Sequence, residues 1–303
     1  MNGVLVLDKP QGFTSFDVIA VVRKLCGQRK IGHTGTLDPM ATGVLPLLLG
    51  CATRAQDLLP DTDKEYQASF QLGVRTDTQD SSGKVLQQMP AHVPPEKVEQ
   101  ALAGLRGDIL QVPPMYSAVQ QNGVRLYELA RRGIEVERQA RPVTVYELQL
   151  TQYDPSSGAG GLRVRCSKGT YVRTLCADLG EILGCGCMMT ALRRTVACGF
   201  SLEQSLTIEQ LKQMPPQQIE GRLLDVQLLF SRYPAVCVSA AQAKRFANGG
   251  ALAYGRLKLA AGPQDGARYR VLDENRRFVG LGQVASAGEP ELRVLRLFLP
   301  AAQ

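Results

Sequence analysis

The chain has no tryptophan and only two histidines, His33 and His92, among its 303 residues. Its eight cysteines include no Cys-x-x-Cys pair. Zinc sites usually combine such pairs with further cysteines or histidines, so we expect no metal site. Long apolar runs are also missing, because no stretch reaches the roughly eighteen continuous apolar residues of a membrane span. The first residues, Met1–Val4, carry no basic segment followed by an apolar run. We therefore expect a cytoplasmic protein with reduced thiols and no contact with a membrane.

What the chain does have is an excess of positive charge, with a formal net charge of +7. From Gly221 to the end there are 12 Lys and Arg against 6 Asp and Glu, so most of the excess lies in the last quarter. A basic balance favours a polyanionic partner, although many basic proteins bind no nucleic acid. The composition predicts a basic appendage on a roughly neutral body.

Strand and helix patterns alternate without a regular βαβ rhythm, which predicts an α+β fold with a mixed or antiparallel sheet core flanked by helices. Period-two and buried apolar runs predict strands at Val4–Leu7, Tyr66–Leu72, Val143–Leu148 and Leu162–Cys166, and the apolar run Leu45–Leu49 is expected to be buried. Apolar spacing and caps predict four helices: one capped by Ser15 and ended by Gly27, one opened by Pro94-Pro95 and closed by Gly107, one over Leu126–Arg132, and one over Tyr171–Leu183.

The composition changes after about Arg232. A polar run, Lys212–Gln218, is expected to be an exposed loop or linker. Beyond it, four short strands separated by turn residues predict a small β-rich domain; they cover Val236–Val238, Arg268–Leu272, Phe278–Val284 and Leu292–Phe298.

The segment Gly32–Pro39 is the most informative, because it places one carboxylate, Asp38, on a loop shaped by glycine and proline. Gly35 and Gly43 permit backbone angles closed to other residues, and Pro39 favours an extended Asp38. A rigid loop of this kind presents its carboxylate to a ligand. Asp-Pro pairs also start turns that carry no chemistry, so the spacing alone leaves both interpretations open.

Four motifs follow one another along the chain: Lys9-Pro10-x-Gly12-x-Thr14-Ser15, the Asp38 segment, Lys64-x-Tyr66, and Lys168-Gly169-Thr170-Tyr171-x-Arg173. Together with Gly73–Gly83, Pro113–Ala118, Gly123–Arg131 and Leu192–Thr195, they resemble the bacterial tRNA pseudouridine synthases of the TruB family from Leu5 to about Ser201. The tail is similar in character to the PUA-like RNA-binding domain that many members carry. The resemblance implies a catalytic domain over 1–230 and a PUA-like domain over 231–303.

The resemblance further implies isomerisation of the T-loop uridine at position 55 of tRNA to pseudouridine, with no cofactor. It implies a monomer that binds the T-arm stem-loop without an obligate protein partner. Asp38 would be the nucleophile, adding to the ribose C1′, assisting proton loss at C2′, or adding to the base; the sequence does not choose among these. Arg173 would orient this carboxylate and keep it ionised. A structural ion pair or phosphate contact is the alternative for Arg173, with Lys168 beside it.

Other residues acquire roles by the same resemblance. Tyr66 would stack on the uracil, with its hydroxyl taking part in removal of the C5 proton, although an ordinary strand tyrosine would look the same. Tyr171 and Leu192 would line the uracil pocket, although a helical leucine such as we expect at 192 is usually core. His33 would fill the space left by the flipped base, or would simply bond to its own turn. Five further cations are expected to be solvated or phosphate-facing, namely Lys9, Arg163, Arg165, Arg193 and Arg194.

Two other classes of protein remain to be weighed. An RNA-binding protein without chemistry has no need of a carboxylate that repels a polyanion, so Asp38 favours catalysis. A glycoside hydrolase needs a second acid across the scissile bond. Asp77 and Asp80 are available for that role, but their Thr- and Gly-rich surroundings are more typical of a polar turn.

Overall fold

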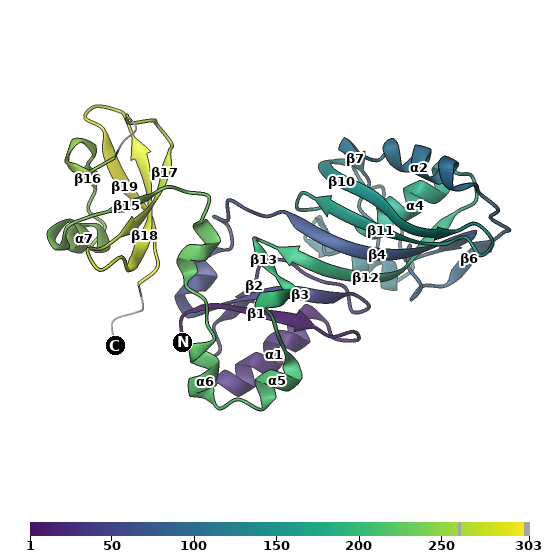
Figure 1. Cartoon of the computed structure of the whole chain (residues 1–303), viewed down its shortest axis with the longest axis horizontal. Coiled ribbons are helices and arrows are strands. Elements are labelled where there is room, and N and C mark those ends of the chain that lie inside the picture. The colour runs from purple at the N-terminus through teal and green to yellow at the C-terminus, as the bar shows by residue number, and fades with distance from the viewer. Residues whose placement is uncertain (260–261, 300–303) are drawn as a thin grey trace.

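The computed structural model describes residues 1–259 and 262–299. Within them, ten strands form one mixed sheet whose main path runs β14-β1-β3-β12-β4-β11-β10-β7 (Figure 1), with β2 beside β3 and β13 beside β12. The pairs β1–β14 and β3–β12 are parallel and the others are antiparallel. The strands are β1 Gly3–Lys9, β2 Ile31–His33, β3 Thr42–Leu49, β4 Lys64–Leu72, β7 Gly107–Gln111, β10 Arg141–Asp154, β11 Ala159–Cys166, β12 Cys187–Ala197, β13 Phe200–Ser201 and β14 Leu206–Thr207.

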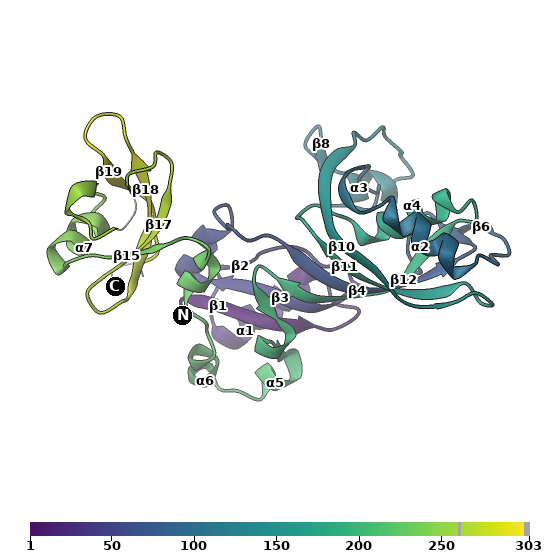
Figure 2. The same cartoon turned by 45° about the horizontal axis from the view of Figure 1, so that its top comes forward.

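Helices cover the two halves of this sheet separately. Residues of α1, α5 and α6 pack with β1 and β3 in one core, and residues of α2 and α4 pack with β4, β10, β11 and β12 in another (Figures 1 and 2). The helices are α1 Ser15–Cys26, α2 Pro95–Ala103, α3 Leu126–Arg131, α4 Val172–Ile182, α5 Ile208–Lys212, α6 Pro216–Gly221 and α7 Ala240–Ala247; the short 3-10 turns are η1 Gly50–Ala55, η2 Leu202–Gln204, η3 Val226–Phe230 and η4 Tyr254–Arg256. The predicted α+β class is confirmed.

Two small hairpins extend from the main sheet. They pair β5 Val74–Thr76 with β6 Val85–Gln88, and β8 Gln120–Gln121 with β9 Val124–Arg125. The β5–β6 hairpin lies at the end of the molecule remote from α1 in both views (Figures 1 and 2).

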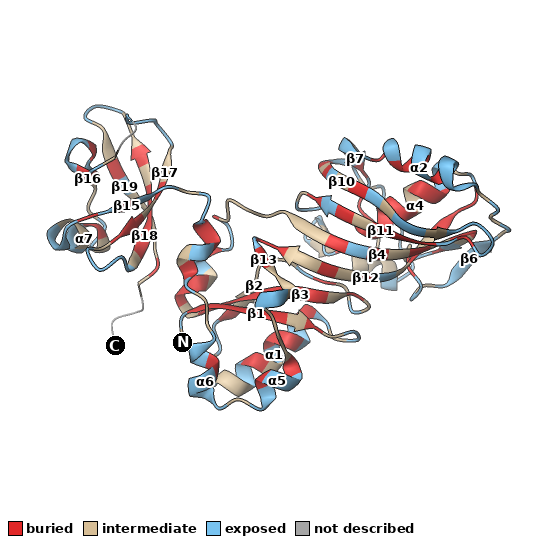
Figure 3. Cartoon of the chain, viewed as in Figure 1, coloured by how far each residue is buried: buried red, intermediate tan, exposed pale blue. Residues whose placement is uncertain are grey.

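The C-terminal part forms its own five-stranded sheet, in the order β15-β17-β18-β19-β16. Its strands are β15 Ala235–Cys237, β16 Leu252–Ala253, β17 Arg268–Leu272, β18 Phe278–Ala285 and β19 Glu291–Leu297. Phe278 and Phe298 stack on each other at 5.3 Å between ring centroids, and Phe298 also contacts Phe230 of η3. This aromatic cluster buries the junction between the C-terminal sheet and the main body (Figure 3).

The start of α1 differs from its prediction by one residue. Thr14, not Ser15, caps the helix: its hydroxyl accepts from the Asp17 amide at 3.1 Å, and the Asp17 carboxylate accepts from the Thr14 amide at 2.8 Å. The Ser15 hydroxyl instead accepts from the Leu37 amide at 2.9 Å and donates to the Leu37 carbonyl at 3.3 Å. Ser15 thereby ties the helix start to the loop that carries Asp38. Gly27 ends the helix in a left-handed conformation, as predicted.

Three other predictions of secondary structure were wrong. Helix α2 ends at Ala103 with Gly104 as its cap, while Gly107 opens β7 instead. The run 212–218 is not one loop, because Pro216 starts a second short helix there. Leu192 lies on strand β12 and not on a helix. Two apolar residues, Ala191 and Leu192, are followed by two charged ones, Arg193 and Arg194, so local periodicity did not indicate the strand.

Candidate active site

Asp38 lies on the loop between β2 and β3, and main-chain bonds hold that loop on both sides. The Ala41 amide donates to the Asp38 carbonyl at 3.0 Å, and the Gly12 amide donates to the Pro39 carbonyl at 2.8 Å. Leu37, just before Asp38, is buried in the core. The carboxylate itself keeps 37% of its surface exposed. The loop is therefore anchored, while its acid stays accessible.

Only one of the two glycines assigned to this loop has an unusual conformation. Gly43 has φ +105°, and a Cβ there would lie 2.2 Å from the Arg194 carbonyl oxygen, so glycine is what lets β3 approach β12. Gly35 has no positive φ; a Cβ there would lie 3.4 Å from Cε of Lys64 and 3.8 Å from Nη1 of Arg194. The expectation for Gly35 was wrong.

Arg173, the second residue of α4, forms an ion pair with Asp38. Its Nε lies 3.0 Å from Oδ2 of Asp38, and its guanidinium is only 5% exposed. Its other two nitrogens donate to main-chain carbonyls, Nη1 to Thr78 at 2.9 Å and Nη2 to Tyr116 at 2.9 Å. The guanidinium therefore has one edge left for the carboxylate, and both groups are fixed in direction.

A second carboxylate faces the same arginine. Oδ2 of buried Asp80 lies 3.6 Å from Nη1 of Arg173, and Oδ1 accepts from the Thr78 hydroxyl and the Ser82 amide. The polar turn expected around Asp80 is present. Its contact with Arg173 was not foreseen, because it depends on how the turn docks on α4.

Tyr66, Leu192 and Arg194 share one face of the sheet. Leu192 on β12 pairs with Ala68 on β4, and Arg194 pairs with Tyr66. Tyr66 is 6% exposed, and burial raises its pKa to about 12, with the neighbouring Arg194 opposing the shift. Its hydroxyl is thus protonated at neutral pH. Leu192 is buried in the core that also contains Tyr66 and Leu37.

Arg194 was expected to be solvated, and that prediction was wrong. The residue has no exposed surface. Its guanidinium donates to the carbonyls of Val44 at 2.7 Å, Gly35 at 3.1 Å and Thr36 at 3.4 Å. It therefore connects β12 to the segment that leads to Asp38. The signal was present in the sequence, since Arg194 is two residues from Leu192 and must share its face once that segment is a strand.

Lys9 is also buried, so the prediction of a solvated or phosphate-facing charge was wrong. Its Nζ donates to the carbonyls of Phe13 at 2.6 Å, Pro10 at 3.0 Å and Pro39 at 3.4 Å. Burial is the main cause that lowers the pKa of Lys9 to about 8, and Asp38 opposes this shift. Lys9 thus stabilises the turn next to Asp38 through these buried hydrogen bonds.

The other three cations are partly exposed but paired with carboxylates. Arg193 forms an ion pair with Asp8 at 2.7 Å, Arg163 with Glu65 at 2.7 Å, and Arg165 with Glu147 at 3.3 Å. The predicted alternation on β11 is confirmed. Its outward arginines are neutralised locally and are not free charges.

His33 ends β2 and is half-buried. Its ring meets that of Phe16 edge to face, with 6.1 Å between centroids and 84° between planes. Its Nδ1 is buried without a hydrogen-bond partner. Burial, and next to it Arg194, lowers the pKa of His33, so the imidazole is neutral at pH 7. A histidine that only bonds to its own turn would use this nitrogen, so the lack of a bond there argues against that alternative.

Tyr171 precedes α4 as its cap residue, and its ring is half-buried. The Gln111 side chain accepts from its amide at 2.7 Å and donates to its carbonyl at 3.2 Å. These bonds connect the start of α4 with β7, two residues from Arg173.

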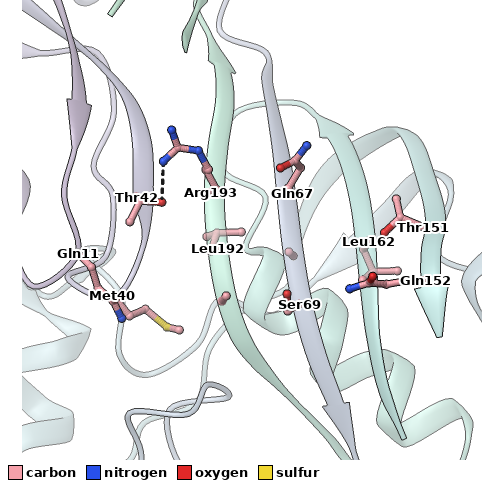
Figure 4. Close-up of a pocket in the computed structure, with 13 residues that line it drawn as sticks. Gln11, Met40, Thr42, Gln67, Ser69, Thr151, Gln152, Leu162, Leu192 and Arg193 are labelled. Carbon is pink, nitrogen blue, oxygen red and sulfur yellow. Dashed lines mark hydrogen bonds between the residues drawn. The ribbon is translucent and has the colours of Figure 1, made fainter. Parts of the chain in front are cut away.

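A hollow of about 470 Å³ opens nearby, and Figure 4 shows its lining. Met40 and Leu192 reach it, but Asp38, Tyr66 and Arg173 do not line it. Gln67, Ser69 and Arg193 alternate along their strands with Tyr66, Ala68 and Arg194, so they face the other side of the sheet. Ala68, Leu162 and Leu192, which also line the hollow, belong to the core that contains Tyr66, so the hollow adjoins the Tyr66 side of the sheet as well. Across the described residues, no group of three His, Cys, Asp or Glu is arranged to hold a metal ion.

The fold and the arrangement around Asp38 can be compared with those of known proteins. A model described as "TruB family pseudouridylate synthase (N terminal domain)" matches residues 23–172. Models for the tRNA pseudouridylate synthase B C-terminal domain and for the C-terminal part of pseudouridine synthase II TruB match residues 173–229 and 234–298. The fold and site thus have the character of a pseudouridylate synthase.

Whole-chain comparisons agree. The tRNA pseudouridine synthase B of Aromatoleum aromaticum is 46% identical over 288 residues, covering 95% of this chain and 90% of the relative. That of Escherichia coli O1:K1 is 40% identical, covering 99% and 97%. The chain belongs to the TruB family of pseudouridylate synthases.

Solved structures are similar over almost the whole chain. The chain in a structure of an H/ACA RNP bound to a substrate RNA containing 2′-deoxyuridine superposes with TM-score 0.74 at 25% identity, covering 98% of this chain and 85% of that one. A chain of a Cbf5-Nop10-Gar1 complex gives TM-score 0.73 at 27% identity, with the same coverage. In residues 1–259 and 262–299, no helix has the length and apolarity needed to cross a bilayer.

Proposed function

We propose that this protein isomerises the T-loop uridine at position 55 of tRNA to pseudouridine, with Asp38 as the catalytic carboxylate. The observation that carries the proposal is the 3.0 Å pairing of an accessible Asp38 with a buried, fully engaged Arg173. The relatives that share most of this chain are named for the same activity.

The reaction breaks the N1–C1′ bond of the uridine, turns the ring over, and joins C1′ to C5. C5 then loses its proton, and N1 gains one. Asp38 acts on the detachment step by adding to C1′, by assisting proton loss at C2′, or by adding to the base. Each route needs an ionised carboxylate aimed at one place. Arg173 supplies that orientation through Nε.

The uridine has to leave its stack to reach Asp38, which costs a few kcal/mol of stacking, and we propose that a neutral His33 fills the gap. Tyr66, Tyr171 and Leu192 would form the walls around the uracil. Because burial keeps the Tyr66 hydroxyl protonated, it would accept the C5 proton only by passing its own proton on. In this proposal Tyr66 therefore transfers protons as a neutral hydroxyl and does not act as a preformed tyrosinate base.

We also propose that residues 1–230 form the catalytic domain and residues 231–303 a PUA-like RNA-binding domain. The separate sheet that starts at β15 and the excess of positive charge beyond Gly221 support this division. We propose a cytoplasmic monomer that takes the T-arm stem-loop without an obligate protein partner. Sedimentation of the protein alone and with one stem-loop tests the stoichiometry.

The test of the activity compares three proteins on a T-arm stem-loop, with chemical mapping of pseudouridine. Asp38→Asn keeps the shape and removes the charge, while Asp57→Asn changes a surface carboxylate that pairs with Arg296. We expect product from the wild type and from Asp57→Asn, and none from Asp38→Asn. Product from all three would contradict the role of Asp38. Binding without product in any of them would favour an RNA-binding protein without chemistry.

A further inference from the structure

Phe16 is a large apolar side chain left open to solvent beside the candidate site. It is the second residue of α1 and is 63% exposed. Single exposed apolar residues are common on protein surfaces. An exposed aromatic ring next to a candidate catalytic loop, however, is a candidate binding surface.

The backbone around Phe16 is held rigidly against the Asp38 loop. Thr14 and Asp17 close the capping box at the helix start, and the Ser15 hydroxyl makes two bonds to Leu37, next to Asp38. The backbone of Phe16 is therefore held next to the loop that carries the candidate catalytic carboxylate. A rigid aromatic surface loses little entropy when it binds a ligand.

The ring also stands against His33. The two planes are 84° apart, with 6.1 Å between centroids. A nucleobase lying parallel to His33 would therefore meet the Phe16 ring nearly at a right angle. A base that stacks on His33 therefore cannot also stack on Phe16. The face of the Phe16 ring is available to a different base, one that is rotated out of the stack containing His33.

We propose that Phe16 is a stacking surface for a second unpaired nucleobase of the RNA substrate, distinct from the base that lies against His33. The inference rests on the proposed function, which supplies an RNA with unpaired loop bases. An aromatic face accepts any base, because every base has a π-face, so Phe16 would contribute affinity and placement without reading sequence.

A first experiment measures the affinity of the full chain for the T-arm stem-loop. Phe16→Ala and Phe16→Leu remove the ring, Phe16→Tyr keeps it, and Leu86→Ala on β6 is a matched control, since Leu86 is 64% exposed at the remote hairpin. We expect binding about 5- to 100-fold weaker for the Ala and Leu variants. We expect near wild-type binding for Phe16→Tyr and Leu86→Ala.

Salt separates stacking from a phosphate contact in the same titrations. Because a phenyl ring releases no counterions, Phe16→Ala should weaken binding equally at low and high salt and leave the salt slope unchanged. Equal affinity for Phe16→Ala and wild type would overturn the proposal, as would a weakening by Phe16→Tyr equal to that by Phe16→Ala.

A second experiment uses the lack of tryptophan in this chain. Phe16→Trp places a single indole at the proposed surface, and Leu86→Trp places one at the control position. Stacked bases should quench the first on addition of RNA and leave the second unchanged. Stem-loops with one abasic loop position each should identify the nucleotide, because quenching is lost only when that base is missing. Quenching at neither position, or equally at both, would overturn the inference.

Failure of this inference is distinguishable from failure of the proposed function. If the wild type forms pseudouridine while Phe16→Ala binds equally well, only the role of Phe16 is wrong. If the wild type forms no product but Phe16→Trp is quenched, the stacking surface stands and the isomerase proposal fails.

Discussion

Nε of Arg173 lies 3.0 Å from Oδ2 of Asp38, although the two residues are far apart in the sequence. The terminal nitrogens of the same guanidinium are held by the carbonyls of Thr78 and Tyr116. The arginine thus joins four segments at one point, and its contact with Asp38 is the consequence of that docking.

Replacing Arg173 by lysine keeps the charge but leaves one nitrogen in place of three. We expect Arg173→Lys to lower kcat by about 100-fold or more, because the carboxylate loses its fixed direction. We expect the free energy of unfolding to fall by about 3 kcal/mol, because Asp80 and two carbonyls lose a buried partner. Single-turnover kinetics and urea unfolding measure the two effects. Arg75→Lys, at an exposed ion pair with Glu181, is the control, and a wild-type kcat for Arg173→Lys would refute the orienting role.

Removing the Tyr66 hydroxyl tests the proton relay. Tyr66→Phe keeps the ring, so we expect kcat to fall about 100-fold with little change in RNA affinity. An unchanged kcat would restrict Tyr66 to packing and stacking.

The pH dependence of Tyr66 follows from its environment. Its pKa in the folded chain, about 12, is above the ordinary value of 10.0. Its contribution to stability is therefore complete below pH 10 and is lost as the pH rises towards 12. The difference in absorbance at 295 nm between wild type and Tyr66→Phe should show no tyrosinate until above pH 10. A titration near pH 10 or below would contradict the burial argument.

Two lysines near the site should respond differently to salt. Lys9 is enclosed by carbonyls, whereas Lys168 is exposed before α4. If Lys9 does not touch phosphate, Lys9→Met leaves the slope of log affinity against log salt unchanged, although it lowers the melting temperature. Lys168→Met should make that slope shallower by about 1. A shallower slope for Lys9→Met would restore it as a phosphate contact.

Arg194 is expected to be as important for folding as for activity. Arg194→Met leaves the carbonyls of Val44, Gly35 and Thr36 without their buried donor, so we expect a loss of about 3 kcal/mol or more in unfolding free energy. Arg194→Lys should recover part of the stability but less of the kcat, because one ammonium cannot hold Gly35, Thr36 and Val44 together. Thermal melts and turnover on the stem-loop provide the comparison. Wild-type stability for Arg194→Met would mean that the carbonyls find other donors.

Periodicity predicted the strands around Tyr66 and Val164 and the helix from 15 to 27. An element that buries one face has apolar residues repeating with its own period, and that pattern is local in the sequence. It failed at Leu192, where the segment was expected to be helical, and the error carried over to Arg194. Boundaries such as Gly104 and Pro216 were missed because several glycines and prolines compete to end an element, and packing selects among them.

By itself the sequence determined the class of fold, the membership of the TruB family and the loop that carries Asp38, since glycine, proline and motif order are local properties. The packing of distant segments determines which charged residues are accessible at the candidate site and which are buried as structural hydrogen-bond donors. Lys9 and Arg194 are both cations in basic motifs, and their burial depends on carbonyls contributed by distant segments. Whether a side chain is buried or solvent-exposed, and hence its role, depends on what the rest of the chain packs around it.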